Sequence, residues 1–344
     1  MLKVLLLPFA LVYGAVSTIR NWLFDLGILK SKAYGVPVVV VGNITVGGTG
    51  KTPHIEYLAH LLADRCRLAV VSRGYGRATK GYLEVEAGSL ASSVGDEPLQ
   101  IKRKFPGMTV AVDEVRTHAI DKLLKDGVAN TFLLDDAFQH RHVKAGVNVV
   151  LVDYNRPIFF DVMLPAGRLR EPRHNIDRAD MVIVSKCPCS LGESDKSSFV
   201  SRLNLKRNQP VFFTRIGYAK LQPINNAQPV EDLKGLQVLA VTGISQPERM
   251  YQYLRNSGAD LHYVEFADHH AFTSIDIDNV KSTFEALNDE KAIVVFTEKD
   301  VARLSPELRL KLENVPAYCL PIQVEFLSDA DKFDALILDA CKCK

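Results

Sequence analysis

A glycine-rich heptapeptide between a strand-like run and a helix-like run most constrains what this chain can fold into. It reads Val46-Gly-Gly-Thr-Gly-Lys-Thr52 and follows the apolar, β-branched residues 38–41. Leucine and isoleucine at helical spacing follow it in residues 55–62. In such a setting glycines let backbone N–H groups approach phosphate oxygens, and the helix N-terminus adds positive potential. The pattern predicts a loop that binds a nucleoside triphosphate.

The residues of this loop have separate expected roles. Lys51 is expected to reach the β- and γ-phosphates, and Thr52 to hold Mg²⁺. The common motif has a glycine where this chain has Thr45, so the loop looks more like the deviant form Gly-Gly-x-Gly-Lys-Thr, which usually has a lysine where Val46 stands. A glycine-rich turn with a fortuitous lysine is the alternative, and the flanking elements count against it. The expected nucleotide contacts are Thr45, Val46, Gly47, Gly48, Thr49, Gly50, Lys51 and Thr52.

Composition narrows the class of protein. The 344 residues are 47% hydrophobic and 24% charged, which is typical of a soluble globular chain of one large or two ordinary domains. The net charge of +2 arises from interspersed residues and gives no nucleic-acid signature. Six cysteines include the pairs Cys187-Pro-Cys189 and Cys341-Lys-Cys343. Their spacing favours free thiols in a reducing compartment, with a joint metal site as a minor alternative.

The N-terminal thirty residues are unusually apolar. About 13 of them, residues 4–16, form an uninterrupted run, which is shorter than the roughly 20 residues that span a bilayer. A cleaved signal peptide would carry a triphosphate-binding loop away from its cytosolic ligand, so that interpretation is discounted. Two remain open on composition: a core helix, or an interfacial helix whose apolar face enters the membrane near Arg20, Lys30 and Lys32.

Strand-like and helix-like segments alternate along the chain, which predicts a parallel sheet with helices on both faces and a second, smaller α/β lobe. We expect a membrane-associating helix in residues 1–30, a P-loop domain in 31–205, a connection in 206–235 and the smaller lobe in 236–344. The expected strands are residues 38–41, 68–71, 110–112, 132–134, 147–152, 181–184, 238–241 and 293–296.

Acidic residues at two places are candidates for chemistry. Asp135 and Asp136 end an apolar strand in the manner of a Walker B element, where a carboxylate binds Mg²⁺ beside the phosphate loop. Asp96 lies in a Gly-Asp-Glu-Pro turn, where it is either an ordinary turn residue or a base that accepts a hydroxyl proton. His269 and His270 are either solvated or part of an acid–base unit; adjacent positions do not favour a shared metal.

Arginines are frequent in the expected loops and helix starts of the first lobe. Guanidinium groups bind phosphate in a bidentate manner and stabilise charge during phosphoryl transfer. An ordinary solvated arginine is the alternative for each position. The residues concerned are Arg73, Arg77, Arg116, Arg168, Arg170 and Arg173.

Together these segments resemble one family, the tetraacyldisaccharide 4'-kinases, the lipid A 4'-kinases of Gram-negative bacteria. The order and spacing of the motifs cover nearly the whole chain. The matching segments are Gly42-Asn-Ile-Thr-Val-Gly-Gly-Thr-Gly-Lys-Thr-Pro53, Ser72-Arg-Gly-Tyr-Gly-Arg77, Val94-Gly-Asp-Glu-Pro98, Leu134-Asp-Asp-Ala-Phe-Gln-His140, Leu164-Pro-Ala-Gly-Arg-Leu-Arg-Glu-Pro172, Thr242-Gly-Ile244, Phe266-Ala-Asp-His269 and Thr297-Glu-Lys-Asp300.

The resemblance implies ATP- and Mg²⁺-dependent phosphorylation of the 4'-hydroxyl of an acylated glucosamine disaccharide 1-phosphate, giving lipid IVA. It implies two lobes closing around ATP, and peripheral association with the cytoplasmic face of the inner membrane. No protein partner is predicted. By match to the family, Asp96 is the base, His269 orients it, and Asp135 and Asp136 hold the metal. Other positions expected in the site are Arg73, Glu97, Arg116, Arg170 and Glu171.

A second function class stays open on the loop alone. The deviant-looking loop could belong to an ATPase or GTPase that acts as a nucleotide-dependent switch or delivers a metal. That alternative gives no purpose to the apolar N-terminus or to the second lobe.

Overall fold

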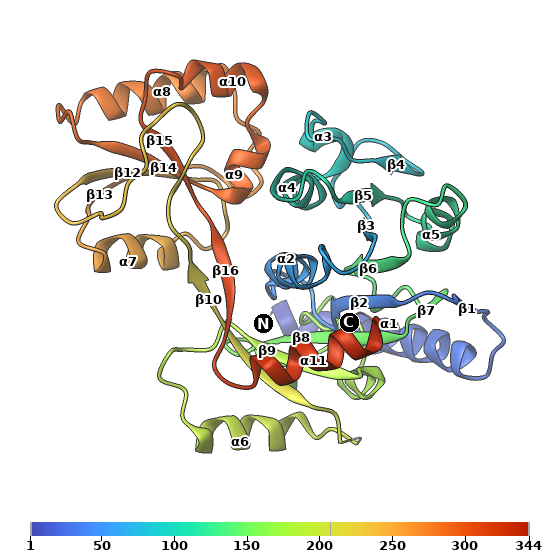
Figure 1. The fold of residues 1–344 in the computed structure, drawn as a ribbon. Coiled ribbons are helices and arrows are strands. Elements are labelled where there is room, and N and C mark those ends of the chain that lie inside the picture. The colour runs from blue at the N-terminus through green and yellow to red at the C-terminus, as the bar shows by residue number, and fades with distance from the viewer. Residues whose placement is uncertain (1, 207, 343–344) are drawn as a thin grey trace.

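Two α/β lobes joined by an antiparallel ribbon make up the computed structural model, which describes residues 2–206 and 208–342 (Figure 1). The first lobe is built on a nine-stranded sheet in the order β16-β10-β9-β8-β2-β6-β3-β5-β4. Only the two edge pairings, β16 with β10 and β4 with β5, are antiparallel. The strands are β2 (Val38–Asn43), β3 (Leu68–Ser72), β4 (Leu83–Glu84), β5 (Thr109–Val112), β6 (Thr131–Asp135), β8 (Val147–Asp153), β9 (Met181–Ser185), β10 (Val211–Tyr218) and β16 (Ile322–Phe326).

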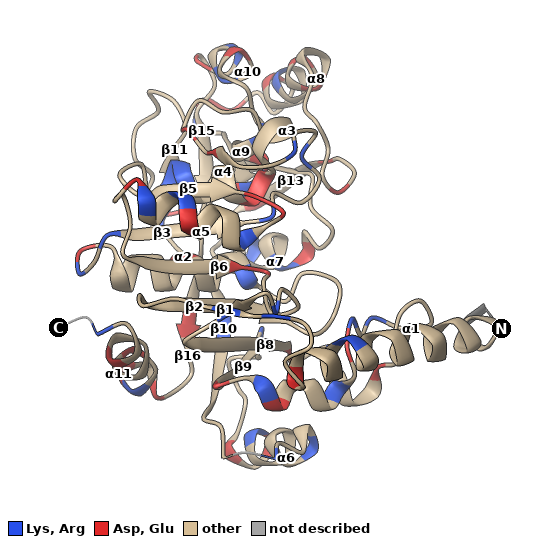
Figure 2. Cartoon of the chain, turned by 90° about the vertical axis from the view of Figure 1, so that its right-hand side faces the viewer, with Lys and Arg blue, Asp and Glu red and all other residues tan. Residues whose placement is uncertain are grey.

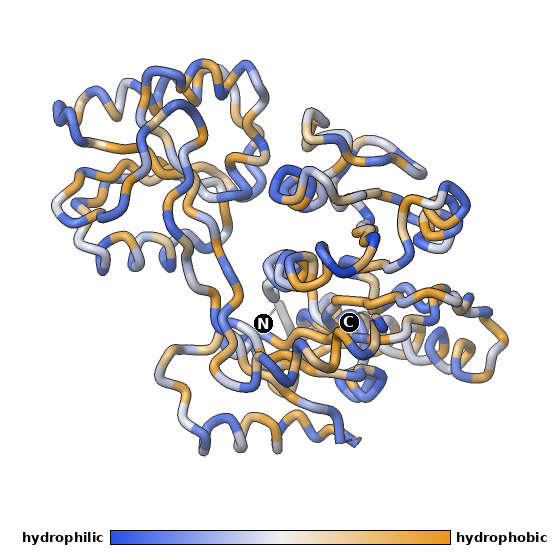
Figure 3. The backbone as a smooth tube through the Cα atoms, in the orientation of Figure 1, coloured by the Kyte–Doolittle hydropathy of each residue, from blue (hydrophilic) through white to orange (hydrophobic). Residues whose placement is uncertain are grey.

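Both faces of this sheet are covered, which confirms the predicted architecture. Alternate strand residues point to opposite faces, so Val38 and Val40 join one apolar core while Val39 and Val41 join the other. Figure 3 draws the central strands in hydrophobic colours. One core includes side chains of α5 (Arg116–Lys125) and α6 (Glu193–Leu203). The other includes α2 (Lys51–Leu62), α4 (Asp96–Lys104) and α11 (Ala330–Ala340).

The second lobe is a five-stranded sheet in the order β11-β15-β14-β12-β13, parallel except for β11. Its strands are β11 (Gln222–Pro223), β12 (Gln237–Thr242), β13 (Asp260–Glu265), β14 (Ile293–Thr297) and β15 (Ala317–Leu320). Its helices are α7 (Glu248–Asn256), α8 (Ser274–Glu285), α9 (Glu298–Arg303) and α10 (Pro306–Lys311). The remaining elements of the first lobe are α3 (Ala91–Val94), the paired strands β1 (Lys32–Ala33) and β7 (Val143–Lys144), and the short helices η1 (Ile158–Phe160) and η2 (Arg173–Arg178).

The chain crosses between the lobes twice. β10 leaves the large sheet and β16 returns to it, paired with β10 from Thr214 opposite Phe326 to Tyr218 opposite Ile322. After this return α11 packs Phe333 into the core of the first lobe. The C-terminal segment therefore lies in the first lobe, whereas the expected division placed residues 236–344 together in the smaller one. The ribbon is the place where the lobes are covalently joined.

The N-terminal helix α1 (Leu2–Asp25) projects along one side of the first lobe (Figures 1 and 2). Residues Val4–Asp25 are long and apolar enough to cross a membrane by length and composition, with a mean hydropathy of 1.4. Polar residues inside the run do not break the helix, so it is longer than the uninterrupted apolar stretch. Only 11% of its apolar window is buried, chiefly where Ala10, Asn21 and Phe24 face the protein. The core-helix interpretation therefore does not fit.

Candidate active site

The phosphate loop lies between the carboxyl end of β2 and the first turn of α2. Gly50 has φ of 87° and Gly47 has φ of 104°, in the left-handed region that favours glycine. Lys51 is the first residue of α2, so the loop places its N–H groups at a helix N-terminus. This is the local geometry that the heptapeptide predicts.

Neighbouring strand ends hold the loop in this shape. Ser185 Oγ donates to the carbonyl of Thr49 at 2.7 Å, and Lys186 Nζ donates to the carbonyl of Gly48. On the other side the N–H of Val46 donates to the carbonyl of Arg168 at 2.8 Å. The loop is therefore fixed before any nucleotide binds, which lowers the cost of ordering it.

Lys51, Arg170 and the acidic residue Asp136 meet at the mouth of the loop. Lys51 Nζ lies 3.6 Å from Asp136 Oδ1, and Arg170 Nη1 donates to both carboxylate oxygens of Asp136 at 2.9 and 3.0 Å. Burial alone would raise the pKa of Asp136, but the charges of Lys51 and Arg170 lower it, so this carboxylate is ionised.

Asp135 is the stronger indication of a cation site. It ends β6 and is buried, and Ser72 Oγ donates to its Oδ2 at 3.2 Å. Its Oδ1 is buried and has no hydrogen-bond partner among the described residues. Burial, then the charges of Glu97 and Asp136, raise the pKa of Asp135 to about 7. An unpartnered buried oxygen beside two carboxylates fits a divalent cation that supplies the missing charge.

The part of the chain that the structure describes contains no group of three or more His, Cys, Asp or Glu side chains arranged as a metal site. Mg²⁺ in phosphoryl-transfer sites usually takes one or two carboxylates plus waters and phosphate oxygens, so Asp135 and Asp136 with Thr52 suffice in type and number. The cysteine pairs add nothing here: Cys187 is buried, Cys189 is exposed, and Cys343 lies outside the described residues.

Two further arginines face the acidic pair. Arg116 begins α5 and is buried, and its Nε has no partner among the described residues. Burial lowers the pKa of Arg116, the charge of Asp135 opposes that shift, and the nearby charge of Arg73 adds to it. Arg73 follows β3 in an exposed, glycine-rich loop. An additional anion between these guanidinium groups would be well stabilised.

Asp96 of the first lobe contacts two residues of the second lobe. It begins α4, not an isolated turn, because the following residues continue as a helix. Its Oδ2 accepts from Nδ1 of His269 at 2.9 Å and from Nε of Arg303 at 2.8 Å, both in the second lobe. Arg303 is in turn held by the carbonyl of Gly243 and by Asp300. His270 instead bonds Asp276 at 3.0 Å.

Glu97, the next residue of α4, joins this site to the phosphate loop. It forms an ion pair with Lys299 of α9 at 3.0 Å. Burial would raise the pKa of Glu97, but Lys299 and then the charge of Lys51 lower it. The first turn of α4 thus lies between the P-loop lysine and the second lobe.

Glu171 lies apart from these residues. Arg170 and Glu171 are neighbours in the chain, but their side chains contact different parts of the protein. Arg170 faces Asp136, whereas Glu171 is buried against Asn21 of α1, Asn175 and Arg178. The structure therefore brings together the expected site residues except Glu171.

Sequence reasoning missed Arg303, Lys299 and the two residues that hold the phosphate loop, Ser185 and Lys186. Lys299 stands inside Thr297-Glu-Lys-Asp300, which was noted without a role. Arg303 lies three residues after Asp300, the spacing at which helical side chains share a face, and this was the available signal.

Comparisons with known proteins agree with this geometry. A family model described as tetraacyldisaccharide-1-P 4'-kinase matches residues 2–342. Tetraacyldisaccharide 4'-kinase from Bacteroides thetaiotaomicron is 44% identical, covering 97% of this chain and 92% of its own. The protein of that name from Flavobacterium johnsoniae is 40% identical, covering 99% and 98%. The crystal structure of LpxK from Aquifex aeolicus in complex with ATP has a TM-score of 0.78 at 30% identity, covering 99% of both chains. The chain therefore belongs to the tetraacyldisaccharide-1-phosphate 4'-kinase family.

Proposed function

We propose that this protein transfers the γ-phosphate of ATP to the 4'-hydroxyl of a tetraacyldisaccharide 1-phosphate, forming lipid IVA in lipid A biosynthesis. The observation that carries the proposal is Asp96: a carboxylate beside the phosphate loop, held by His269 and Arg303 of the other lobe. A phosphatase or switch needs no such second-lobe base, whereas a kinase that phosphorylates a hydroxyl does.

The phosphate loop and Lys51 bind and orient the triphosphate of ATP, through backbone N–H groups and one ammonium. Asp135, Asp136 and Thr52 are the residues that would hold Mg²⁺, which supplies neutralising charge to the phosphate oxygens when bound. Arg116 and Arg170 add guanidinium groups where charge develops on the transferring phosphoryl group. Arg73 and Glu97 complete the nucleotide side of the site.

Asp96 accepts the proton of the attacking hydroxyl. Both hydrogen bonds described above fall on Oδ2, so Oδ1 is the oxygen that takes the proton. His269 and Arg303 stabilise the carboxylate in the orientation that places Oδ1 towards the acceptor. Because these two residues come from the second lobe, the base is complete only when the lobes are together.

The acceptor has four acyl chains and stays in a membrane, so the enzyme must bind there. The apolar, largely exposed α1 supports peripheral association with the cytoplasmic face of the bacterial inner membrane. Arg20 donates to the carbonyl of Gln139 and Lys32 pairs with Asp121, whereas Lys30 is exposed and would meet lipid phosphates. No protein partner is needed for this arrangement.

The proposed reaction is tested by finding which product carries the radioactive phosphate of γ-labelled ATP. The full chain is incubated with γ-labelled ATP, Mg²⁺ and the detergent-dispersed acceptor, and the products are separated. Label in the lipid at the 4' position is the expected result. Label only in free phosphate would instead support the nucleotide-switch alternative and would contradict the kinase.

A further inference from the structure

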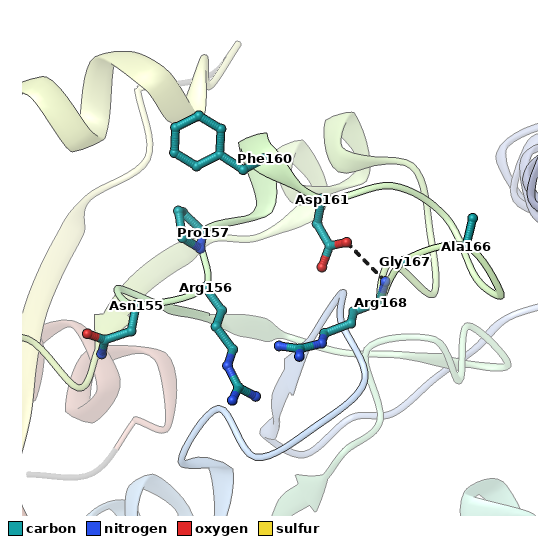
Figure 4. A pocket seen from close by; sticks show the side chains of 8 residues that line it. All are labelled: Asn155, Arg156, Pro157, Phe160, Asp161, Ala166, Gly167 and Arg168. Atoms are coloured by element: carbon teal, nitrogen blue, oxygen red, sulfur yellow. Dashed lines mark hydrogen bonds between the residues drawn. The ribbon is translucent and has the colours of Figure 1, made fainter. Parts of the chain in front are cut away.

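A surface cavity of about 470 Å³ lies beside the phosphate loop, outside the residues given roles above. Its walls are residues 155–157, which follow β8, and residues 160–161 and 166–168 (Figure 4). A smaller adjoining hollow is lined by Val46 and Gly47 and shares Arg156 and Arg168 with the cavity. The cavity therefore adjoins the first residues of the phosphate loop.

Two guanidinium groups enter this space together. Figure 4 shows Arg156 and Arg168 directed to the same side of the cavity. The ion pairs of the described residues include neither of them. Asp161, the carboxylate in the lining, uses its Oδ1 to accept the backbone N–H groups of Val162 at 2.9 Å and Arg168 at 3.1 Å. Asp153, which lines the adjoining hollow, is paired with Lys186 at 3.0 Å, so the two converging guanidinium groups leave an excess of positive charge that favours a bound anion.

The loop that carries Arg168 is tightly folded. A Cβ added at Gly167 would collide with the carbonyl of Val162 and with Asp161, so this loop needs glycine there. The carbonyl of Arg168 also accepts the N–H of Val46. Arg168 is therefore fixed to the phosphate loop through its backbone.

Strand register connects the cavity to the catalytic site. Leu169 forms an antiparallel bridge with Thr45 and is buried, and Arg168 and Arg170 flank it in the chain. Two residues of chain place their Cα atoms at most about 7 Å apart. Arg170 contacts Asp136 at the phosphoryl-transfer site. A molecule reacting there can extend one sugar further and reach Arg168.

The mouth of the cavity is apolar and close to the membrane helix. Phe160, which lines the cavity, is 71% exposed. Met163 lies against α1, where a Cβ at Gly14 would be 3.5 Å from its Cγ. The cavity thus has a cationic interior and an apolar rim beside α1, which suits the phosphorylated end of an acylated sugar.

We propose that Arg156 and Arg168 bind the 1-phosphate of the acceptor disaccharide. This assignment rests on the proposed function, because it takes the acceptor from it. A phosphate monoester bound here fixes the sugar that carries position 1, while the 4'-hydroxyl of the other sugar lies at Asp96. The site selects acceptors that already have an anionic group at position 1.

The test compares two acceptors in detergent micelles: the tetraacyldisaccharide 1-phosphate and the same lipid without its 1-phosphate. Equilibrium binding without ATP, KM for each acceptor, KM for ATP and kcat are measured for the wild type and for the Arg156→Gln/Arg168→Gln variant. Arg255→Gln, which removes an exposed arginine of α7, is the matched control.

The wild type is expected to prefer the 1-phosphate acceptor by about tenfold, the effect of one charge-assisted contact. The double variant loses this preference, with kcat and KM for ATP unchanged, and Arg255→Gln keeps it. A double variant that still prefers the 1-phosphate overturns the assignment. If the double variant instead loses affinity for phosphatidylglycerol vesicles and keeps its preference, the cavity binds membrane phosphate and the assignment also fails. Binding without label transfer in the wild type would contradict the proposed function alone.

Discussion

Arg303 makes the clearest residue-level prediction, since it is a positioning residue and touches no substrate. Its guanidinium holds Asp96 Oδ2 at 2.8 Å and is itself buried. Arg303→Gln should lower kcat roughly 10- to 100-fold, the effect of losing a charge-assisted hydrogen bond of about 1.5–3 kcal/mol. Affinity for ATP should stay within about twofold, because the phosphate loop is untouched.

Steady-state kinetics and ATP titration check this. Arg303→Lys should recover part of kcat, and Arg249→Gln, at an exposed arginine of α7, should have no effect. Equal loss of ATP affinity and kcat would mean that Arg303 supports folding of the lobe and not the orientation of Asp96.

Asp135 should destabilise the protein when no cation is bound. With its pKa raised to about 7 by burial, the folded state keeps a proton that the unfolded state loses above pH about 4. The free energy of unfolding therefore falls as pH rises from about 4 to 7, by a few kcal/mol at about 1.4 kcal/mol per pKa unit. Asp135→Asn removes this contribution.

Thermal unfolding without nucleotide or Mg²⁺ measures the effect. The Tm of Asp135→Asn should exceed that of the wild type at pH 8 and approach it at pH 5, although the variant loses activity. Glu56, whose pKa is also raised to about 7 by burial, contributes equally to both proteins. The same Tm difference at both pH values would contradict the account.

Glu171 should matter for stability. It is buried, and its Oε2 accepts hydrogen bonds from Asn21 and Asn175 and forms an ion pair with Arg178. Glu171→Gln leaves the Arg178 charge without its partner, and breaking a buried pair costs about 3–5 kcal/mol. A large drop in Tm with kcat of the folded fraction within about threefold is expected. Normal Tm with lost kcat would return Glu171 to the catalytic group.

The residue scale also shows why local motifs predict some site members and not others. Apolar runs typical of buried strands precede Lys51, Asp135 and Asp136 in the sequence. The position of these residues at the carboxyl ends of the strands could therefore be predicted. Glu171 is adjacent to Arg170 in sequence, but its side chain packs against α1 and η2 and not against Asp136. Only the backbone conformation of this segment separates their roles.

Among the elements, the helix α1 has one face that packs against the protein and an opposite face that is exposed. Ala10, Asn21 and Phe24 pack against the protein. Val12, Val16 and Ile19 recur at helical spacing on the opposite side and are 65%, 60% and 56% exposed. Such a stripe of exposed apolar side chains is expected to lie in lipid.

Replacing Val12, Val16 and Ile19 by Gln should weaken liposome binding strongly, at roughly 1.5–3 kcal/mol for each side chain that the membrane buries. Because these side chains contact little of the protein, the free energy of unfolding should change by less than about 0.5 kcal/mol per substitution. Co-sedimentation with vesicles and thermal unfolding report the two quantities. Full retention on vesicles would contradict membrane insertion of α1.

Elements with strong local patterns were predictable, and those defined by distant partners were not. The central parallel strands are continuous runs of apolar, mostly β-branched residues, because helices cover both faces of the sheet. β16 and α11 follow the second lobe in sequence yet belong to the first lobe, and β10 lies in the segment 206–235 that was expected to connect the lobes. Pairing of β10 with β16 links residues more than 100 positions apart, which no local pattern reports.

At the scale of the whole molecule, α4 is the contact between the lobes. Besides Asp96 and Glu97, its Lys104 joins Glu56 of α2 at 2.6 Å and Glu298 of α9 at 2.9 Å. These ion pairs cross from the nucleotide helix to the second lobe. The arrangement makes catalysis depend on lobe position, since the base and its two supports lie on opposite sides of the boundary.

The central claim is that Asp96 is the base of a lipid kinase. Single-turnover transfer of label from ATP to the acceptor, compared between the wild type and Asp96→Asn with ATP affinity measured alongside, tests it most directly. The account predicts a rate lower by about 10² or more with ATP affinity unchanged. An unchanged transfer rate in Asp96→Asn would contradict it.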